Sequence, residues 1–87
     1  MKIYNYEGKA NLVGPQIREL RKSCNLSQDE LATKMQLENI PISQKGISRI
    51  EKQERFVADF ELLTFSKVLN VDLQHLFYLS EDRKDTI

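Results

Sequence analysis

The sequence predicts an all-α protein, a compact bundle of five short helices in one domain. Five separate stretches place apolar residues at the three- and four-residue spacing of a helix that buries one face. Serine or aspartate precedes most of these stretches, as expected of helix N-caps. Only three glycines and two prolines occur among 87 residues, which is sparse for a loop-rich or all-β fold. We place an N-terminal arm at residues 1–11, the folded domain at 12–79 and a polar tail at 80–87.

The first helix is expected over residues 12–24. Four side chains fall on one apolar face at helical spacing: Val13, Ile17, Leu20 and Cys24. Pro15 fits only in the first turn, where backbone N–H groups have no intrahelical partner, so the helix begins between residues 12 and 14. The residues before it show no helical period and are therefore assigned to the arm.

The second helix is expected to begin after Ser27. This serine and Glu30 form the sequence pattern of a capping box. In a capping box the side chain of each residue accepts a hydrogen bond from the backbone N–H group of the other. The apolar stripe of this helix consists of Leu31, Ala32 and Met35. Asn39 can take the left-handed conformation that closes a helix, and Pro41 follows it, so the helix ends near Glu38.

The third helix is expected over residues 43–53, with Ser43 as its N-cap. Ile47 and Ile50 form its buried pair. Its opposite face is polar and partly basic: Gln44, Lys45, Ser48, Arg49 and Lys52. Gly46 weakens this helix by about 1 kcal/mol relative to alanine. From composition alone, the polar face is equally well explained as ordinary solvated surface.

Two further helices complete the bundle. Asp59 is expected to cap a helix over residues 60–69, which Asn70 closes. Its buried face has four members, with Phe65 flanking them: Leu62, Leu63, Ser66 and Leu69. Asp72 then caps a short fifth helix with an apolar stripe of Leu73, Leu76 and Phe77. The next two side chains suit either the core or a dimer contact: Tyr78 and Leu79.

Charge is distributed unevenly along the chain. The formal net charge is zero, which is unlike a non-specific nucleic-acid binder. Residues 1–55 nevertheless hold ten basic and seven acidic residues, whereas residues 56–87 hold three and six. The first half is therefore the part expected to face a polyanion.

The sequence offers little for catalysis, metal binding or membrane insertion. Cys24 is the only cysteine, so no internal disulfide and no Cys/His zinc site is expected. His75 is the only histidine and is expected at the surface. We find no Ser/His/Asp set and no phosphate-binding glycine loop, which argues against an enzyme and against a cofactor. No signal peptide or membrane span is apparent, which indicates a cytoplasmic protein.

Two segments suggest a specific family. The run Ser-Gln-Asp-Glu-Leu-Ala begins at Ser27, and Gly-Ile-Ser-Arg-Ile-Glu begins at Gly46. Together with the order of the five helices, they make the chain resemble the Cro/CI-like (XRE) helix-turn-helix family of the phage-repressor type. The resemblance covers residues 12–77. It implies a lambda-repressor-like fold whose second and third helices form the helix-turn-helix, with the third in the DNA major groove.

The resemblance also implies roles for individual residues. Base readers are expected near the start of the third helix: Gln44, Lys45, Ser48 and Arg49. Glutamine can pair with adenine, and arginine or lysine can donate to guanine O6 and N7. Phosphate contacts are assigned to four other residues: Gln28, Ser43, Lys52 and Arg55. Gln28 is also explicable as an ordinary exposed residue in the first turn of its helix. Arg21 and Glu51 correspond to a structural ion pair of the family.

One segment departs from the family pattern. The connection over residues 36–42 is longer than the usual turn between the second and third helices. We expect Asn39 to replace the customary glycine, and Leu37 and Ile40 to pack against the core. The longer connection leaves the angle between the two helices undetermined by the family pattern.

The leading hypothesis is a transcriptional regulator, a repressor, that binds a palindromic operator in double-stranded DNA as a homodimer. The alternative is a protein-binding module of the same fold, such as an antitoxin or adaptor, with another protein as its partner. The acidic second half of the chain motivates this alternative.

Overall fold

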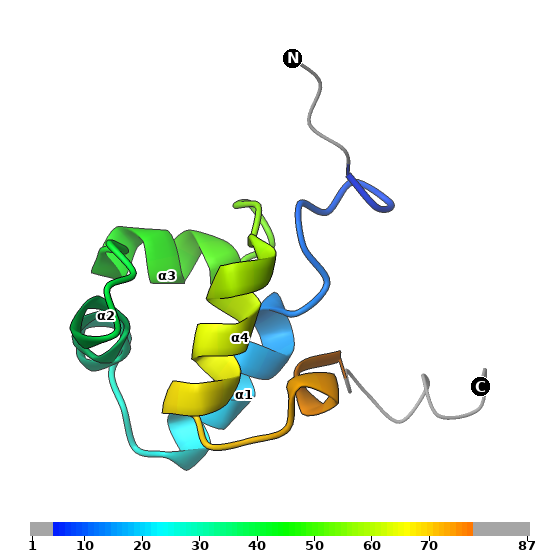
Figure 1. Cartoon of the computed structure of the whole chain (residues 1–87). Helices are drawn as coiled ribbons and strands as arrows, with labels where there is room; N and C mark the ends of the chain where they lie inside the picture. Colours follow the sequence, from blue (N-terminus) through cyan, green and yellow to red (C-terminus); the bar gives the residue numbers. More distant parts are fainter. Residues whose placement is uncertain (1–4, 78–87) are drawn as a thin grey trace.

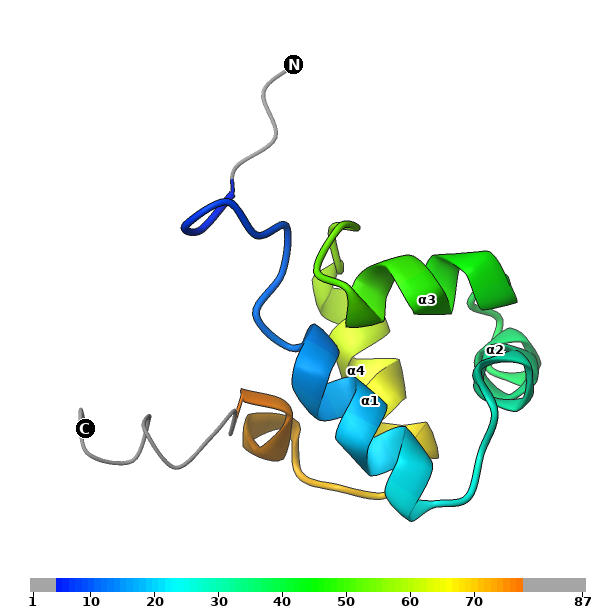
Figure 2. The same ribbon diagram turned by 180° about the vertical axis from the view of Figure 1, so that it is seen from behind.

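The computed structural model describes residues 5–77. Within them the chain forms four α-helices and one 3-10 helix: α1 (Gly14–Ser23), α2 (Gln28–Leu37), α3 (Gln44–Glu51), α4 (Asp59–Val68) and η1 (Leu73–Phe77). In Figure 1 α4 lies in front of α1, and in Figure 2 α1 lies in front, while α3 crosses the same end of both. The predicted all-α fold is confirmed, with the fifth helix present as a 3-10 turn.

Residues in the left-handed region end the helices. Asn25 follows α1 with a φ of 58°, Asn39 follows α2 with 67°, and Asn70 follows α4 with 58°. Asparagine tolerates this conformation better than most residues, and the prediction for Asn39 and Asn70 is confirmed. Gln53 takes a φ of 64°, which ends α3 at Glu51, two residues before its predicted end.

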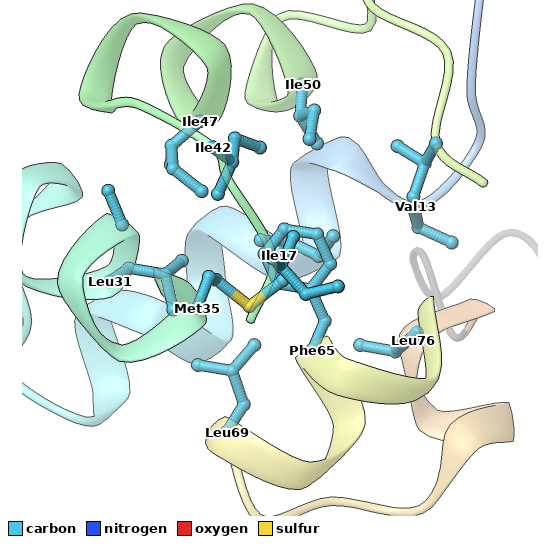
Figure 3. Packing of buried hydrophobic residues seen from close by; sticks show 13 residues of the cluster. Val13, Ile17, Leu31, Met35, Ile42, Ile47, Ile50, Phe65, Leu69 and Leu76 are labelled. Carbon is cyan, nitrogen blue, oxygen red and sulfur yellow. The ribbon is translucent and has the colours of Figure 1, made fainter. Parts of the chain in front are cut away.

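The core lies between α1, α2, α3 and α4, and η1 closes it (Figure 3). Phe65 is its largest fully buried side chain, and Ile17 and Met35 meet it at the centre. The predicted buried pair of α3, Ile47 and Ile50, is fully buried. Helix α2 packs on α3, and Ala32 is one of the buried residues of α2.

Several sequence-based placements of side chains are wrong. Leu63 was expected in the core with Phe65 at its edge, but Phe65 is buried and Leu63 is 62% exposed, because the buried stripe follows Glu61, Phe65 and Leu69 at four-residue steps. Cys24 is exposed because α1 ends at Ser23 and Cys24 is its C-cap. His75 is exposed, as predicted.

The start of α4 differs from the prediction as well. Asp59 is the first helical residue, and Ala58 takes the N-cap position that Asp59 was expected to occupy. Ala58 has no side chain that could cap the helix, but the carboxylate of Glu61 accepts a hydrogen bond of 2.9 Å from the Ala58 N–H group. The alternatives weighed for Tyr78 and Leu79, and the tail at 80–87, lie outside the described residues.

The long connection between α2 and α3 follows the core closely. Ile40 and Ile42 are buried, as expected for Ile40, whereas Leu37 is 78% exposed and its predicted packing is wrong. The Gln36 side-chain amide donates 2.7 Å to the Ile42 carbonyl, which fixes the connection to α2. A Cβ at Gly46 would lie 2.8 Å from the Ile42 side chain. This close packing explains why a glycine occupies this position in α3.

Candidate nucleic-acid interface

Helix α3 lies at one end of the domain (Figures 1 and 2), and its outward face carries polar side chains. Ser43 caps the helix, with its Oγ accepting 3.2 Å from the Gly46 N–H group. The four predicted base readers are exposed except for Ser48, which is half-buried: Gln44, Lys45, Ser48 and Arg49. Because Ile47 and Ile50 hold the opposite face in the core, these side chains project away from the domain.

The Arg21–Glu51 ion pair joins α1 to the end of α3. Arg21 Nε lies 2.6 Å from Glu51 Oε2, and Arg21 Nη2 donates 3.2 Å to Oε1. Arg21 Nη1 also donates 2.7 Å to the Leu26 carbonyl, just before α2. The two side chains are only 11% and 2% exposed, so this bidentate pair is largely shielded from water.

The ion pair extends to the base-reading face through Gln28. Gln28 Nε2 donates 2.9 Å to Glu51 Oε1, and Gln28 Oε1 accepts 2.6 Å from Gln44 Nε2. A continuous set of side-chain hydrogen bonds thus links a buried carboxylate to the first residue of α3. Gln44 uses one of its two amide hydrogens in this contact. The hydrogen bond between Gln28 and Gln44 joins the start of α2 to the start of α3, and the sequence did not indicate it.

A concave surface lies beside this network, between α1, α2 and α3. Five residues line it: Arg18, Gln28, Ser48, Glu51 and Lys52. Arg18 and Lys52 are exposed and bring two positive charges to its rim. Lys52 was predicted to contact phosphate, whereas Arg18 was missed. The sequence feature that could have indicated Arg18 is its position on α1, one turn before Arg21.

Arg55 is placed differently from the other predicted phosphate contacts. Its Nη2 lies 3.0 Å from Glu61 Oε2, and its Nη1 donates 3.1 Å to Oε1 and 2.9 Å to the Phe56 carbonyl. Burial alone would raise the pKa of Glu61, but the hydrogen bonds from Arg55 and Ala58, with the charge of Arg55, lower it overall. The geometry gives Arg55 a structural role at the start of α4.

The C-terminal end of α3 is fixed against the start of α1. Asn11 Nδ2 donates 3.1 Å to the Ile50 carbonyl and 2.8 Å to that of Arg55, and its Oδ1 accepts 2.8 Å from the Gly14 N–H group. A Cβ on Gly14 would lie only 2.1 Å from the Ile50 carbonyl oxygen, so only glycine fits there. Gln53 Nε2 donates 3.1 Å to the Asn11 carbonyl. Sequence reasoning missed this junction.

Comparison with protein families decides the classification. The family model described as Helix-turn-helix matches residues 17–76. The chain belongs to this XRE-type helix-turn-helix family. The match spans the helix-turn-helix formed by α2 and α3 and continues through α4 into η1. The family resemblance stated from the sequence is therefore confirmed.

A solved structure agrees with the helix-turn-helix assignment. The chain is similar to the P22 c2 repressor protein, solved in complex with synthetic operator 9T in the presence of Tl+. The TM-score is 0.66 at 27% sequence identity, covering 80% of this chain and 98% of that one. Comparison with curated proteins gives no match. The helix-turn-helix family and this neighbour support a DNA-binding regulator.

Neither a membrane-crossing helix nor a metal-binding cluster occurs in residues 5–77. Among residues 5–77, no helix has the length and apolar character needed to cross a membrane. In the same range, no three metal-ligating side chains of His, Cys, Asp or Glu come together. The candidate interface comprises the α3 face, the hydrogen bonds that support it and the basic rim beside it.

Proposed function

We propose that this helix-turn-helix protein is a transcriptional repressor that binds an inverted-repeat operator as a homodimer and reads it with α3 in the major groove. The single observation behind this proposal is the exposed polar face of α3, held in one orientation by the hydrogen bonds from Gln44 through Gln28 to Glu51. A base reader needs such support, because a small displacement of the side chain loses the bidentate geometry.

Each proposed base reader has a chemical preference. Gln44 donates one amide hydrogen to Gln28, and its second hydrogen and its carbonyl oxygen match the N7 and N6 edge of adenine. Arg49 and Lys45 match the two acceptors of guanine. Ser48 lies beside Gln44 on the helix and can donate to or accept from either kind of base.

Phosphate binding is assigned to the positive rim and to helix termini. Arg18 and Lys52 flank the concave surface beside α3, where a strand of the DNA backbone would pass. Ser43 and the backbone at the start of α2 supply polar groups near the positive ends of two helices. We assign Gln28 to positioning Gln44 as well as to this contact. Arg55 is removed from the proposed set because Glu61 already binds its guanidinium.

The P22 c2 repressor supports the regulatory side of the proposal, since that protein was solved on an operator. A bound dimer would repress by occupying DNA that other proteins need, in the cytoplasm or nucleoid.

The alternative function, a protein-binding module, is favoured by the acidic residues of the second half of the chain. It predicts a stoichiometric protein partner without any preference among DNA sequences.

Selection of bound duplexes from a random DNA pool tests the function. We expect an enriched inverted repeat, and affinity for it that falls steeply with salt as phosphate contacts are lost. Arg49→Ala should reduce affinity for the best site by about 1–3 kcal/mol and relax preference at one base pair. Lys34→Ala is the matched control, because Lys34 is exposed on α2 beside Leu37 and Lys67, outside the proposed contacts. Failure to enrich any sequence would refute sequence-specific reading.

A further inference from the structure

Three large apolar side chains are exposed on α4 and in the connection that precedes it. Phe60 is 60% exposed and Leu63 is 62% exposed, and their three-residue spacing places them on one side of the helix. Phe56, which is 61% exposed, lies in the connection just before α4. We name these three exposed side chains, Phe56, Phe60 and Leu63, the α4 face. Phe60 and Leu63 lie opposite the buried stripe of the same helix, which includes Phe65 and Leu69.

The α4 face is large enough to be an interface. Its three side chains expose on the order of 350 Å² of apolar surface, given the areas of such side chains. This falls in the range of about 300–600 Å² that marks functional patches on monomers. A homodimer interface is about 65% apolar. The α4 face would then form the centre of an interface burying about 1,100 Å² in total, near the lower limit of specific association.

The position of the α4 face relative to α3 identifies the occupant. The core separates α4 from α1, so the α4 face points away from α1, while α3 crosses one end of both helices (Figures 1 and 2). A two-fold axis running beside α4 and roughly parallel to it would bring two α4 faces together. The same rotation keeps both α3 helices at one end of the dimer, which is what an inverted repeat requires.

We propose that the α4 face binds the α4 face of a second copy of this chain, and that this contact sets the spacing of the two α3 helices on DNA. This inference rests on the proposed reading of an inverted repeat. The contact is isologous, so Leu63 and Phe60 of each copy face the same residues of the other. Its modest size favours a reversible dimer whose formation DNA binding reinforces.

Leu73 and Phe77 form the competing apolar surface, on η1. They are 45% and 46% exposed, less than the members of the α4 face, and they belong to a helix of only five residues. Leu37 is the most exposed large apolar side chain among the described residues but lies at the end of α2. These positions supply variants that separate the α4 face from general surface hydrophobicity.

Sedimentation equilibrium of the full chain tests the contact directly. We expect a reversible monomer–dimer equilibrium for the unchanged protein and at least tenfold weaker self-association for Leu63→Lys. Leu37→Lys adds the same charge and should change self-association less than twofold. Circular dichroism verifies that each variant keeps its helices, as expected for exposed positions. Equal effects of the two substitutions, or dissociation by Leu73→Lys instead, would overturn the assignment of the α4 face.

Titration of single half-sites and inverted repeats separates this inference from the proposed function. Leu63→Lys should keep the affinity and base preference of a half-site but lose at least tenfold on the inverted repeat, relative to Leu37→Lys. If Leu63→Lys binds the inverted repeat as tightly as Leu37→Lys does, the α4 face is refuted as the dimer contact, while the proposed reading of DNA by α3 stands. A dimer that depends on Leu63 in a chain without any sequence preference would instead support the interface and refute the function.

Discussion

Two arginine–glutamate pairs have the same chemistry in different surroundings. Arg21 and Glu51 are 30 residues apart in sequence, and their side chains are 11% and 2% exposed. Arg55 and Glu61 are six residues apart, and theirs are 31% and 9% exposed. Both pairs are bidentate, so geometry alone does not distinguish them.

The two pairs differ in what else they contact. Glu51 also accepts from Gln28, and through it the pair reaches Gln44 on the outward face of α3. Glu61 instead accepts from the Ala58 N–H group and so fixes the first turn of α4. The long-range pair joins three helices and orients the proposed reading face, while the local pair stabilises one helix start.

Arg21→Ala should have the largest effect. It leaves the Glu51 carboxylate buried without its cationic partner, and breaking a buried ion pair in this way costs about 3–5 kcal/mol. Urea unfolding followed by circular dichroism measures the loss. A double variant, Arg21→Met with Glu51→Leu, should recover part of it, because no unpaired charge remains. A loss below 1 kcal/mol for Arg21→Ala would show that solvent already screens the pair.

Arg55→Ala should lower the free energy of unfolding by a smaller amount, about 1–2 kcal/mol, because this pair is more exposed. At temperatures where the variant is folded, its DNA affinity should keep the salt dependence of the unchanged protein. Lys52→Ala, by contrast, should reduce the slope of affinity against salt by about one phosphate contact. A reduced slope for Arg55→Ala would return Arg55 to the phosphate-binding set.

The pH dependence of stability should report on Glu61. Its pKa in the folded protein lies below the ordinary value of 4.5 because the contacts with Arg55 and Ala58 outweigh its burial. The ionised form therefore stabilises the fold above that value, and the contribution is lost as pH falls through the lowered pKa. Urea midpoints measured between neutral pH and pH 3 should fall less steeply for Glu61→Gln. Identical slopes in the two proteins would contradict this assignment.

The sequence predicted the features that depend on neighbours along the chain. The capping box of Ser27 and Glu30 forms as expected, with bonds of 2.8 and 3.0 Å, because both partners lie within one helical turn. The left-handed Asn39 follows from local conformational preference in the same way. The placement of Leu63 failed because one helical step decides between core and solvent, and the stripe had more apolar candidates than the core accommodates.

Contacts between distant segments were outside the reach of sequence patterns. The close approach of Gly14 to the Ile50 carbonyl and the bonds of Asn11 depend on how α3 crosses α1. Nothing local distinguishes that glycine from one in a turn. The Arg21–Glu51 pair was anticipated only through the family resemblance, and the partner of Arg55 was not anticipated at all.

Gln28→Ala should have the smallest effect and tests the link between the long-range pair and DNA reading. Arg21 still neutralises Glu51 in this variant, so the fold should lose less than about 1 kcal/mol. Gln44 loses the partner that holds its amide, and affinity for the selected site should fall by about 0.5–1 kcal/mol. The loss should concentrate at the base pair that Gln44 reads.

A double-mutant cycle with Gln44→Ala distinguishes positioning from a separate phosphate contact by Gln28. If Gln28 acts by holding Gln44, its removal should cost little once Gln44 is already alanine, because no side chain remains to be oriented. If Gln28 acts independently, through phosphate, the two losses should add, and the preference at the base pair read by Gln44 should survive Gln28→Ala. Additivity would therefore confine the buried pair to a structural role, whereas strong coupling would extend its influence to the base-reading face.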